Sequence, residues 1–195
     1  GLEIGMHDPR AFQGGGPHYA CAPTGGRHTE GLTIGVEFGG SAPKLGYPRS
    51  MDRFSTPGKG KLAKTFQDWR AFINAAGWCL FAHVYGAYSD EEKFVKVFEI
   101  VTGLRMTIEE ALRTGERIFN LKKAFNVRHG ASKEEDTLPQ RLLTEPNKRA
   151  AGSVVRLDKT LSRYYQARGW DVRTSKPKRR RLLELGLVDV ANDLC

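Results

Sequence analysis

One short segment, residues 68–81, holds the residue types that could do chemistry: Asn74, Gly77 and Cys79 follow one another along an aromatic-rich stretch. Gly77 can turn the backbone tightly or lie against a flat ligand, because glycine lacks a Cβ atom. The Asn74 amide can both donate and accept hydrogen bonds to a heterocycle. A Cys79 thiolate could hold iron, since iron–sulfur clusters take cysteine sulfurs as ligands. The residues leave a plainer interpretation open, in which Cys79 is a small buried hydrophobic side chain.

A histidine on a glycine-bounded loop is the second candidate. His28 follows Gly25 and Gly26 closely, and histidine titrates near neutral pH, so it could give or take a proton during redox chemistry at a carbonyl. The alternative is an ordinary glycine turn with His28 in solvent. The sequence has four other histidines, His7, His18, His83 and His129. No two of them have the spacing of a local metal site. Without a Cys-x-x-Cys pair, local motifs alone cannot enclose a zinc ion or an iron–sulfur cluster.

The positive net charge is the feature that suggests nucleic-acid binding. The 195 residues carry 31 Lys and Arg against 22 Asp and Glu, a formal net charge of +9. The densest basic block, residues 176–181, has no interleaved aromatic residues, so we expect a solvated turn there rather than a phosphate-binding patch. The sequence has no Walker loop, dinucleotide-binding glycine pattern or nucleophile elbow, which disfavours phosphoryl transfer and nicotinamide chemistry.

Cellular context follows from what the apolar stretches and cysteines can support. Every apolar stretch is broken well short of the roughly 18–20 residues that cross a bilayer. No secretory signal is recognisable, and cysteines at positions 21, 79 and 195 have neither the number nor the spacing of a disulfide framework. These observations predict a cytoplasmic protein. The chain starts at Gly1 without a methionine, so we expect truncation or processing, although artificial trimming would look the same.

The elements that must position these residues are mainly helices. Residues 1–60 are rich in Gly and Pro and predict a long loop segment that faces a cofactor or substrate, with a short strand near residues 32–38. Apolar spacing of three and four and capping residues predict helices over 61–74, from Ser89 to Gly103, from Thr107 to Gly130, from Asp158 to Gly169 and from Pro177 to Gly186. The fold class is therefore mainly α, with helical subdomains in residues 61–195.

Four stretches carry a recognisable pattern, and the tail of the chain continues it. They are Met6–Arg10 leading to Tyr19-Ala20 and Gly25–His28, then Asn74–Cys79, then Gly115–Leu121 with Ala124–Arg128, and Asp136–Leu142; the tail adds Leu157-Asp158, Tyr164-Tyr165, Arg168–Asp171 and Leu185–Leu187. Together they resemble the carboxy-terminal part of the tungsten- or molybdenum-dependent aldehyde ferredoxin oxidoreductase family.

This resemblance implies a pair of helical subdomains that pack on an amino-terminal β-rich domain and close over a bis-pterin tungsten or molybdenum cofactor beside a four-iron four-sulfur cluster. Residues 74–79 match a motif usually written Asp-x-x-Gly-Leu-Cys, whose acid binds the pterin and whose cysteine is a cluster ligand. The resemblance thus implies cofactor contacts by Asn74, Gly77, Trp78 and Cys79, with Cys79 on the metal cluster and His28 as the catalytic histidine. Asn74 replaces the acid and brings no negative charge, and Trp78 replaces leucine.

The same resemblance implies partners. Family members oxidise aldehydes to carboxylic acids and pass electrons to ferredoxin, and the other cluster cysteines and the amino-terminal domain would lie upstream of Gly1, so we expect this chain alone to be inactive. Part of its positive charge would serve anionic pterin phosphates or an acidic ferredoxin. The rival hypothesis is a cofactor-free helical binding module that acts through its basic surface. Nucleic-acid binding ranks third, and a homo-oligomer is left open.

Overall fold

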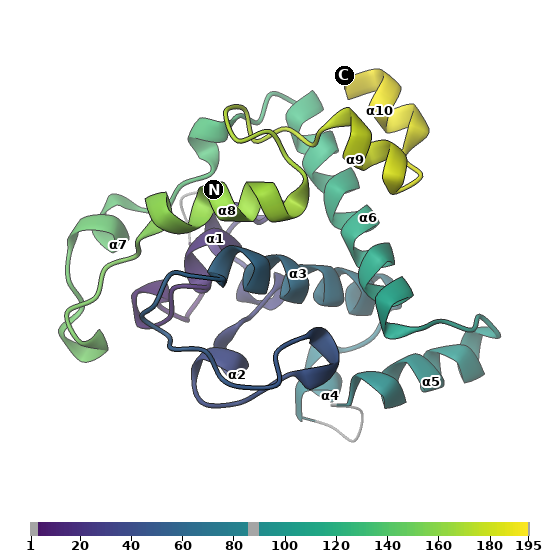
Figure 1. The fold of residues 1–195 in the computed structure, drawn as a ribbon, viewed down its shortest axis with the longest axis horizontal. Helices are drawn as coiled ribbons and strands as arrows, with labels where there is room; N and C mark the ends of the chain where they lie inside the picture. Colours follow the sequence, from purple (N-terminus) through teal and green to yellow (C-terminus); the bar gives the residue numbers. More distant parts are fainter. Residues whose placement is uncertain (1–3, 86–89, 195) are drawn as a thin grey trace.

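The computed structural model describes residues 4–85 and 90–194. Its α-helices, shown in Figure 1, are α1 (Gly15–Ala20), α2 (Ile34–Glu37), α3 (Lys59–Ala75), α4 (Leu80–Tyr85), α5 (Glu91–Thr102), α6 (Ile108–Arg128), α7 (Gln140–Thr144), α8 (Leu157–Arg168), α9 (Arg179–Glu184) and α10 (Val188–Leu194). In the described ranges, β-structure amounts to isolated bridges such as Ala42 to Tyr47. The predicted mainly α fold class is confirmed.

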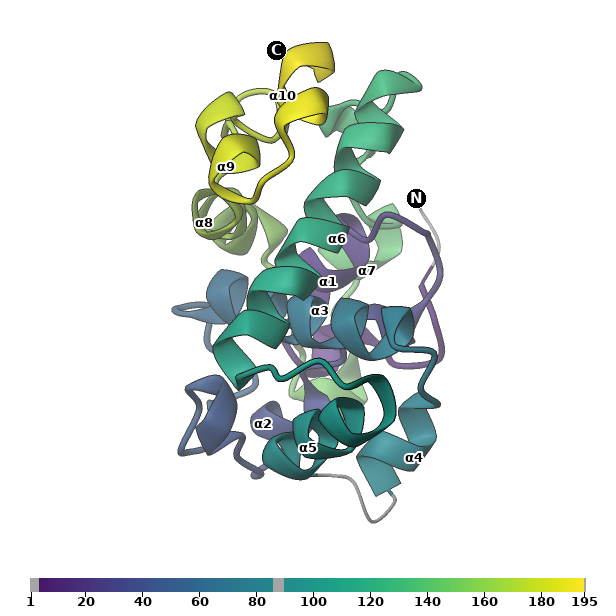
Figure 2. The ribbon, with the colours of Figure 1, turned by 90° about the vertical axis from the view of Figure 1, so that its right-hand side faces the viewer.

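Helix α3 lies at the centre and packs against α6 and α8 (Figures 1 and 2). The crossing of α3 and α6 is unusually close at Gly115. A Cβ atom added there would lie 1.8 Å from the backbone oxygen of Asp68, so the two helices touch backbone to backbone. Glycine is required at this position because any side chain would push the helices apart.

Two hydrophobic clusters form the core on either side of α3. One contains Tyr19, Cys21, Phe119, Tyr165 and Trp170, which come from segments that are distant in sequence. The other is lined by the side chains Val36, Leu45, Leu62, Trp69 and Phe94. Residues from the first sixty contribute to both clusters, and the division of the chain at residue 60 stays a prediction.

A buried polar network joins α8 to α3. The guanidinium group of Arg168 is fully buried and pairs with the Asp68 carboxylate. Its Nε donates to the Tyr164 hydroxyl at 3.0 Å, and an Nη donates to Gln67 Oε1 at 2.7 Å. The same group lies 3.8 Å from the centre of the Phe119 ring. A buried charge of this kind is tolerated because almost all its donors have partners.

The amino-terminal segment corrects one sequence expectation. The strand expected near residues 32–38 is wrong, because the chain forms α2 there. That turn brings Glu37 into the interior, where its carboxylate accepts from the Gly14 amide at 3.0 Å and the Thr33 hydroxyl at 2.6 Å and pairs with Lys59. The segment also contains the short helix α1, which is buried throughout.

All five expected helices are confirmed, and their ends differ by one or two residues. Thr107 and Glu110 form the predicted capping box at the start of α6. Helix α5 begins after Asp90, whose carboxylate accepts from the Glu92 and Lys93 amides at 2.8 and 3.1 Å, so the expected cap at Ser89 is displaced; Ser89 itself lies outside the described residues.

The remaining helix ends also shift slightly. Helix α6 ends at Arg128, two residues before the expected Gly130. Asp158 lies inside the first turn of α8 instead of capping it, because the helix begins one residue earlier. Pro177 precedes α9, which begins at Arg179, so it stands two residues ahead of the first helical turn. Gly103 and Gly169 close α5 and α8 as expected, in left-handed conformations that glycine adopts without strain.

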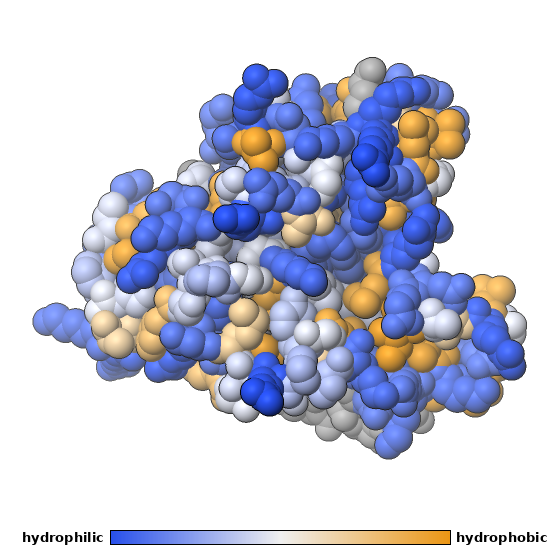
Figure 3. Space-filling view, viewed as in Figure 1, coloured by the Kyte–Doolittle hydropathy of each residue, from blue (hydrophilic) through white to orange (hydrophobic). Residues whose placement is uncertain are grey.

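The visible surface is mostly polar, and apolar side chains gather where α5 and α6 meet (Figure 3). Ile100, Val101 and Leu104 at the end of α5 are among the exposed large hydrophobic residues. Among the described residues, no helix is both long and apolar enough to cross a membrane.

Candidate functional site

The end of α3 presents the first candidate segment. The helix is closed by hydrogen bonds from the Gly77 amide to the Asn74 carbonyl and from the Trp78 amide to the Ile73 carbonyl, both 3.2 Å. Gly77 has φ +71°, a left-handed backbone conformation that residues other than glycine adopt only with strain. No described atom lies within 4 Å of the position where its Cβ would be. Glycine is therefore needed here for the turn.

This turn aims three of the predicted site residues outward. Asn74, Gly77 and Cys79 are exposed, while Trp78 is half-buried with its ring edge against Phe94, 5.2 Å between ring centres. The interpretation of Cys79 as a small buried hydrophobic residue is wrong, because the turn at Gly77 carries it to the surface just before α4. A thiol in this position is open to a ligand or a partner.

Cys21 occupies the environment that the plainer interpretation assigned to Cys79. It lies in the cluster that contains Tyr165 and Trp170, and burial raises its pKa well above the ordinary value for a thiol. The two described cysteines thus differ sharply in access to solvent.

The second candidate, His28, opens a short 3-10 helix, His28–Glu30, and is half-buried. Its ring meets that of His7 edge to face, with the centres 4.6 Å apart. Burial, reinforced by the nearby His7, lowers the pKa of His28 below its usual value, which favours the neutral imidazole. The solvent-facing glycine turn considered from the sequence does not describe this packed histidine.

Other polar groups converge on the same place around Gly5. A Cβ atom added at Gly5 would lie 2.9 Å from His28 Nδ1, 3.2 Å from the Tyr19 hydroxyl and 3.3 Å from the Gly26 carbonyl. The Tyr19 ring lies beside the His18 ring, with the ring centres 4.9 Å apart and the planes tilted by 49°. Sequence reasoning missed His7 and His18 because the fold, and no local spacing, brings them to His28.

Several buried atoms in this neighbourhood have no hydrogen-bond partner among the described residues. They are both ring nitrogens of His18, the Tyr19 hydroxyl and one carboxylate oxygen of Glu30. Burial lowers the pKa of His18 to about 4 and raises that of Tyr19 to about 12. Backbone groups of Arg27 and His28 nevertheless lie beside the His18 ring, and backbone groups of Gly5 and His7 lie beside the Tyr19 hydroxyl. Polar groups are therefore gathered in this region.

The two candidate segments lie on one face of the molecule. In Figure 2 the amino-terminal segment and α4 both lie along the right-hand side, which is the face turned away from the viewer in Figure 1. Each carries an exposed large apolar side chain, Met6 beside His7 and Phe81 shortly after Cys79. In the part of the chain that the structure describes, no group of three or more His, Cys, Asp or Glu side chains could hold a metal ion.

The comparisons with known proteins identify the family of the chain. A family model described as aldehyde ferredoxin oxidoreductase, domains 2 and 3, matches residues 1–187. The chain belongs to the aldehyde ferredoxin oxidoreductase family. A tungsten-containing aldehyde ferredoxin oxidoreductase of Pyrococcus abyssi is 39% identical over 189 residues, and one of Pyrococcus furiosus is 37% identical over 192 residues. These alignments cover 95% and 96% of this chain.

This aldehyde ferredoxin oxidoreductase family chain spans only 30% of the length of each of these two relatives. Both relatives are named as tungsten-containing enzymes. The residues present here could form only part of the surroundings of such cofactors: polar groups gather near Gly5, and Cys79, expected on an iron–sulfur cluster, offers a single accessible sulfur. The roles of His28, Asn74, Gly77, Trp78 and Cys79 stay predictions.

Proposed function

We propose that this chain is the carboxy-terminal part of an enzyme that oxidises an aldehyde to a carboxylic acid at a pterin-bound tungsten or molybdenum. In the overall reaction an aldehyde and water give the acid, two protons and two electrons, and a four-iron four-sulfur cluster passes the electrons to ferredoxin. The observation that carries the proposal is the accessible Cys79 thiol at the end of α3, in a chain that belongs to this family.

Cys79 is the proposed cluster ligand of this chain. The left-handed turn at Gly77 ends α3 and leaves the sulfur exposed, and iron–sulfur clusters are held by cysteine thiolates. One cysteine supplies only one of the several ligands that a cluster requires, so the remaining ligands would come from elsewhere in the enzyme. Asn74, exposed on the last turn of the same helix, would contact the pterin through hydrogen bonds without adding charge.

His28 is the proposed proton carrier. The bound metal would take up the two electrons of the substrate, which is the chemistry that the cofactor supplies. Because burial and His7 lower the pKa of His28, the neutral imidazole is favoured, and this form can accept a proton released from water or aldehyde. The ring contact with His7 fixes its orientation.

Metal analysis of the complete gene product tests the proposal. We expect tungsten or molybdenum together with iron in anaerobically prepared protein. Finding neither metal would reject the enzyme and favour a cofactor-free binding module that acts through the basic surface, for which the missing negative charge at Asn74 is the supporting observation.

Substitution of the two described cysteines tests the role of Cys79. Cys79→Ser should change the electron paramagnetic resonance spectrum of the reduced cluster, because one sulfur ligand is replaced by oxygen. Cys21→Ala, at the buried cysteine, is the matched control and should leave that spectrum as it is. An identical signal in wild type and Cys79→Ser would remove the proposed ligand.

Asn74→Asp tests the pterin contact. The variant restores the carboxylate that the family motif usually carries, so we expect the tungsten or molybdenum content to be retained or to rise, whereas Asn74→Leu should lower it. Equal metal content in all three proteins would show that position 74 makes no contact with the cofactor.

A further inference from the structure

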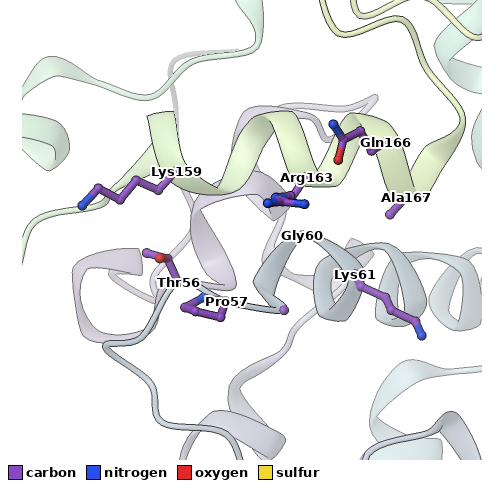
Figure 4. A pocket seen from close by; sticks show the side chains of 9 residues that line it. Thr56, Pro57, Gly60, Lys61, Lys159, Arg163, Gln166 and Ala167 are labelled. Carbon is purple, nitrogen blue, oxygen red and sulfur yellow. The ribbon is translucent and has the colours of Figure 1, made fainter.

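A cavity of about 670 Å³ lies at the other end of α3 from Cys79. It is formed by the loop that precedes α3, by the first turn of that helix and by one side of α8, and its lining includes Thr56, Lys61, Lys159, Arg163 and Gln166 (Figure 4). Helix α3 has 17 residues, so at 1.5 Å per residue its two ends are about 25 Å apart. The cavity is therefore separate from the segment proposed to meet the cofactor.

The lining of this cavity is positively charged and unbalanced. Lys61, Lys159 and Arg163 are exposed, and none of them forms an ion pair with any described residue. Within the described chain, no carboxylate lines the cavity. Lys64 and Arg181, by contrast, are held by Glu116. A concave wall with three uncompensated cations concentrates positive potential and attracts anions.

The positions of the three cations indicate the shape of the anion. Figure 4 shows Arg163 in the middle of the pocket above Gly60, with Lys159 and Lys61 extending to opposite flanks. The ammonium groups of both lysines point away from Arg163, and each ends a flexible four-carbon stem that can turn toward a ligand. An extended chain of charged groups offers one group to Arg163 and others to lysines that turn toward it, and arginine and lysine are both common phosphate ligands.

The volume and the remaining lining fit the same ligand class. A volume of about 670 Å³ is that of a small-molecule pocket. The Thr56 hydroxyl and the Gln166 amide add uncharged hydrogen-bonding groups, and Pro57 and Ala167 add limited apolar surface. No aromatic ring lines the cavity within the described residues, so nothing here selects for stacking of a base.

We propose that this cavity is a binding site for an extended phosphate chain, a di- or triphosphate that is either free or part of a nucleotide. Arg163 holds the central phosphate, and Lys61 and Lys159 neutralise the two ends. The site recognises the phosphate chain by charge and does not depend on the metal cofactor.

Calorimetric titration of the complete gene product with inorganic tripolyphosphate at low salt is the direct test. We expect saturable one-to-one binding that weakens as salt rises. Loss of a charge-assisted hydrogen bond should make the dissociation constant of Arg163→Gln at least about tenfold larger. Arg163→Lys should recover part of the affinity, because it keeps the charge but loses the planar fork.

The matched control is Arg149→Gln. Arg149 is also an exposed arginine without an ion pair to the described residues, and it lies outside this cavity. Its removal should leave tripolyphosphate binding unchanged. Circular dichroism and the metal content of each variant should match wild type, which separates this site from the proposed cofactor site.

ATP distinguishes the sources of the phosphate chain. Equal affinity for ATP and tripolyphosphate would mean that the phosphates alone are recognised, and tighter binding of ATP would identify a nucleotide ligand; both results support the site. Absence of binding by either compound would overturn it. Equal weakening by Arg163→Gln and Arg149→Gln, or preferential binding of a single-stranded oligonucleotide, would overturn it in favour of diffuse attraction to a basic surface.

Discussion

His18 shows how single residues in this chain are tuned by burial. It is completely buried, its ring lies beside Tyr19, and the effect of burial on its pKa outweighs that of the nearby backbone of Arg27 and His28. The imidazole therefore stays neutral where an exposed histidine would begin to take up a proton. Such a group makes the free energy of unfolding depend on pH, independently of any reaction.

The first prediction follows from the pKa of His18, which burial lowers from 6.5 to about 4. Above pH 6.5 neither the folded nor the unfolded chain protonates it, so stability is unaffected. Between pH 6.5 and 4 only the unfolded chain binds the proton, and the free energy of unfolding should fall by about 3 kcal/mol in total. Urea unfolding across this pH range measures the loss.

His18→Phe should remove this part of the pH dependence, because phenylalanine does not titrate. His129→Gln, at an exposed histidine, is the control and should keep the wild-type profile. If His18→Phe and wild type lose stability in parallel between pH 6.5 and 4, the buried neutral histidine is not the cause.

At the scale of elements, the ends of helices decide where the candidate site is presented. Thr107 and Glu110 could be recognised in the sequence because a capping box acts within four residues. Helix α1 could not be recognised: Gly15 and Gly16 are poor helix formers, and the helix is stabilised by packing Tyr19 and Ala20 into the core.

The same distinction separates the parts of the candidate site. Asn74, Gly77 and Cys79 lie in one continuous segment, so their common presentation at a helix end could be predicted. The meeting of His28 with His7 and Tyr19 could not, because it depends on how distant loops fold against each other around Gly5.

The second prediction concerns the turn that presents Cys79. Gly77→Ala should destabilise the chain by about 1–2 kcal/mol, the cost of a left-handed residue with a Cβ atom, since no neighbour clashes there. Gly35→Ala is the matched control: it also has open space around the added atom but lies within α2, where alanine is favoured. Thermal unfolding should show a loss in the first variant only.

The third prediction concerns the crossing of α3 and α6. Gly115→Ala places a methyl group against the backbone oxygen of Asp68, which cannot move as a flexible side chain could. We expect destabilisation of about 3 kcal/mol, the upper end of the usual cost of overpacking. Chemical denaturation measures it, and a loss no larger than that of Gly35→Ala would contradict the close crossing.

At the scale of the whole molecule, buried charges connect helices that are far apart in sequence. Asp68 on α3 is paired with Arg168 on α8 and with Lys64 on its own helix, and burial nevertheless raises the pKa of its carboxyl group. Lys64 also pairs with Glu116 on α6, which in turn holds Arg181 on α9. One charge network therefore spans α3, α6, α8 and α9.

The fourth prediction tests this network. Arg168→Met should cost about 3–5 kcal/mol, because it leaves the Asp68 carboxylate buried without its main partner. The double variant Arg168→Met with Asp68→Leu should be more stable than the single variant, since no isolated charge remains. Denaturant unfolding of both proteins provides the comparison, and additive losses would count against direct coupling.

The accessible sulfur at the head of α4 has a practical consequence for handling the protein. The exposed Cys79 thiol can contact the Cys79 thiol of a second molecule, and oxidation by dissolved oxygen would join the two by an intermolecular disulfide. Dimers seen on a native gel without reductant would then reflect air oxidation. Only dimers that persist in reducing agent would indicate non-covalent self-association.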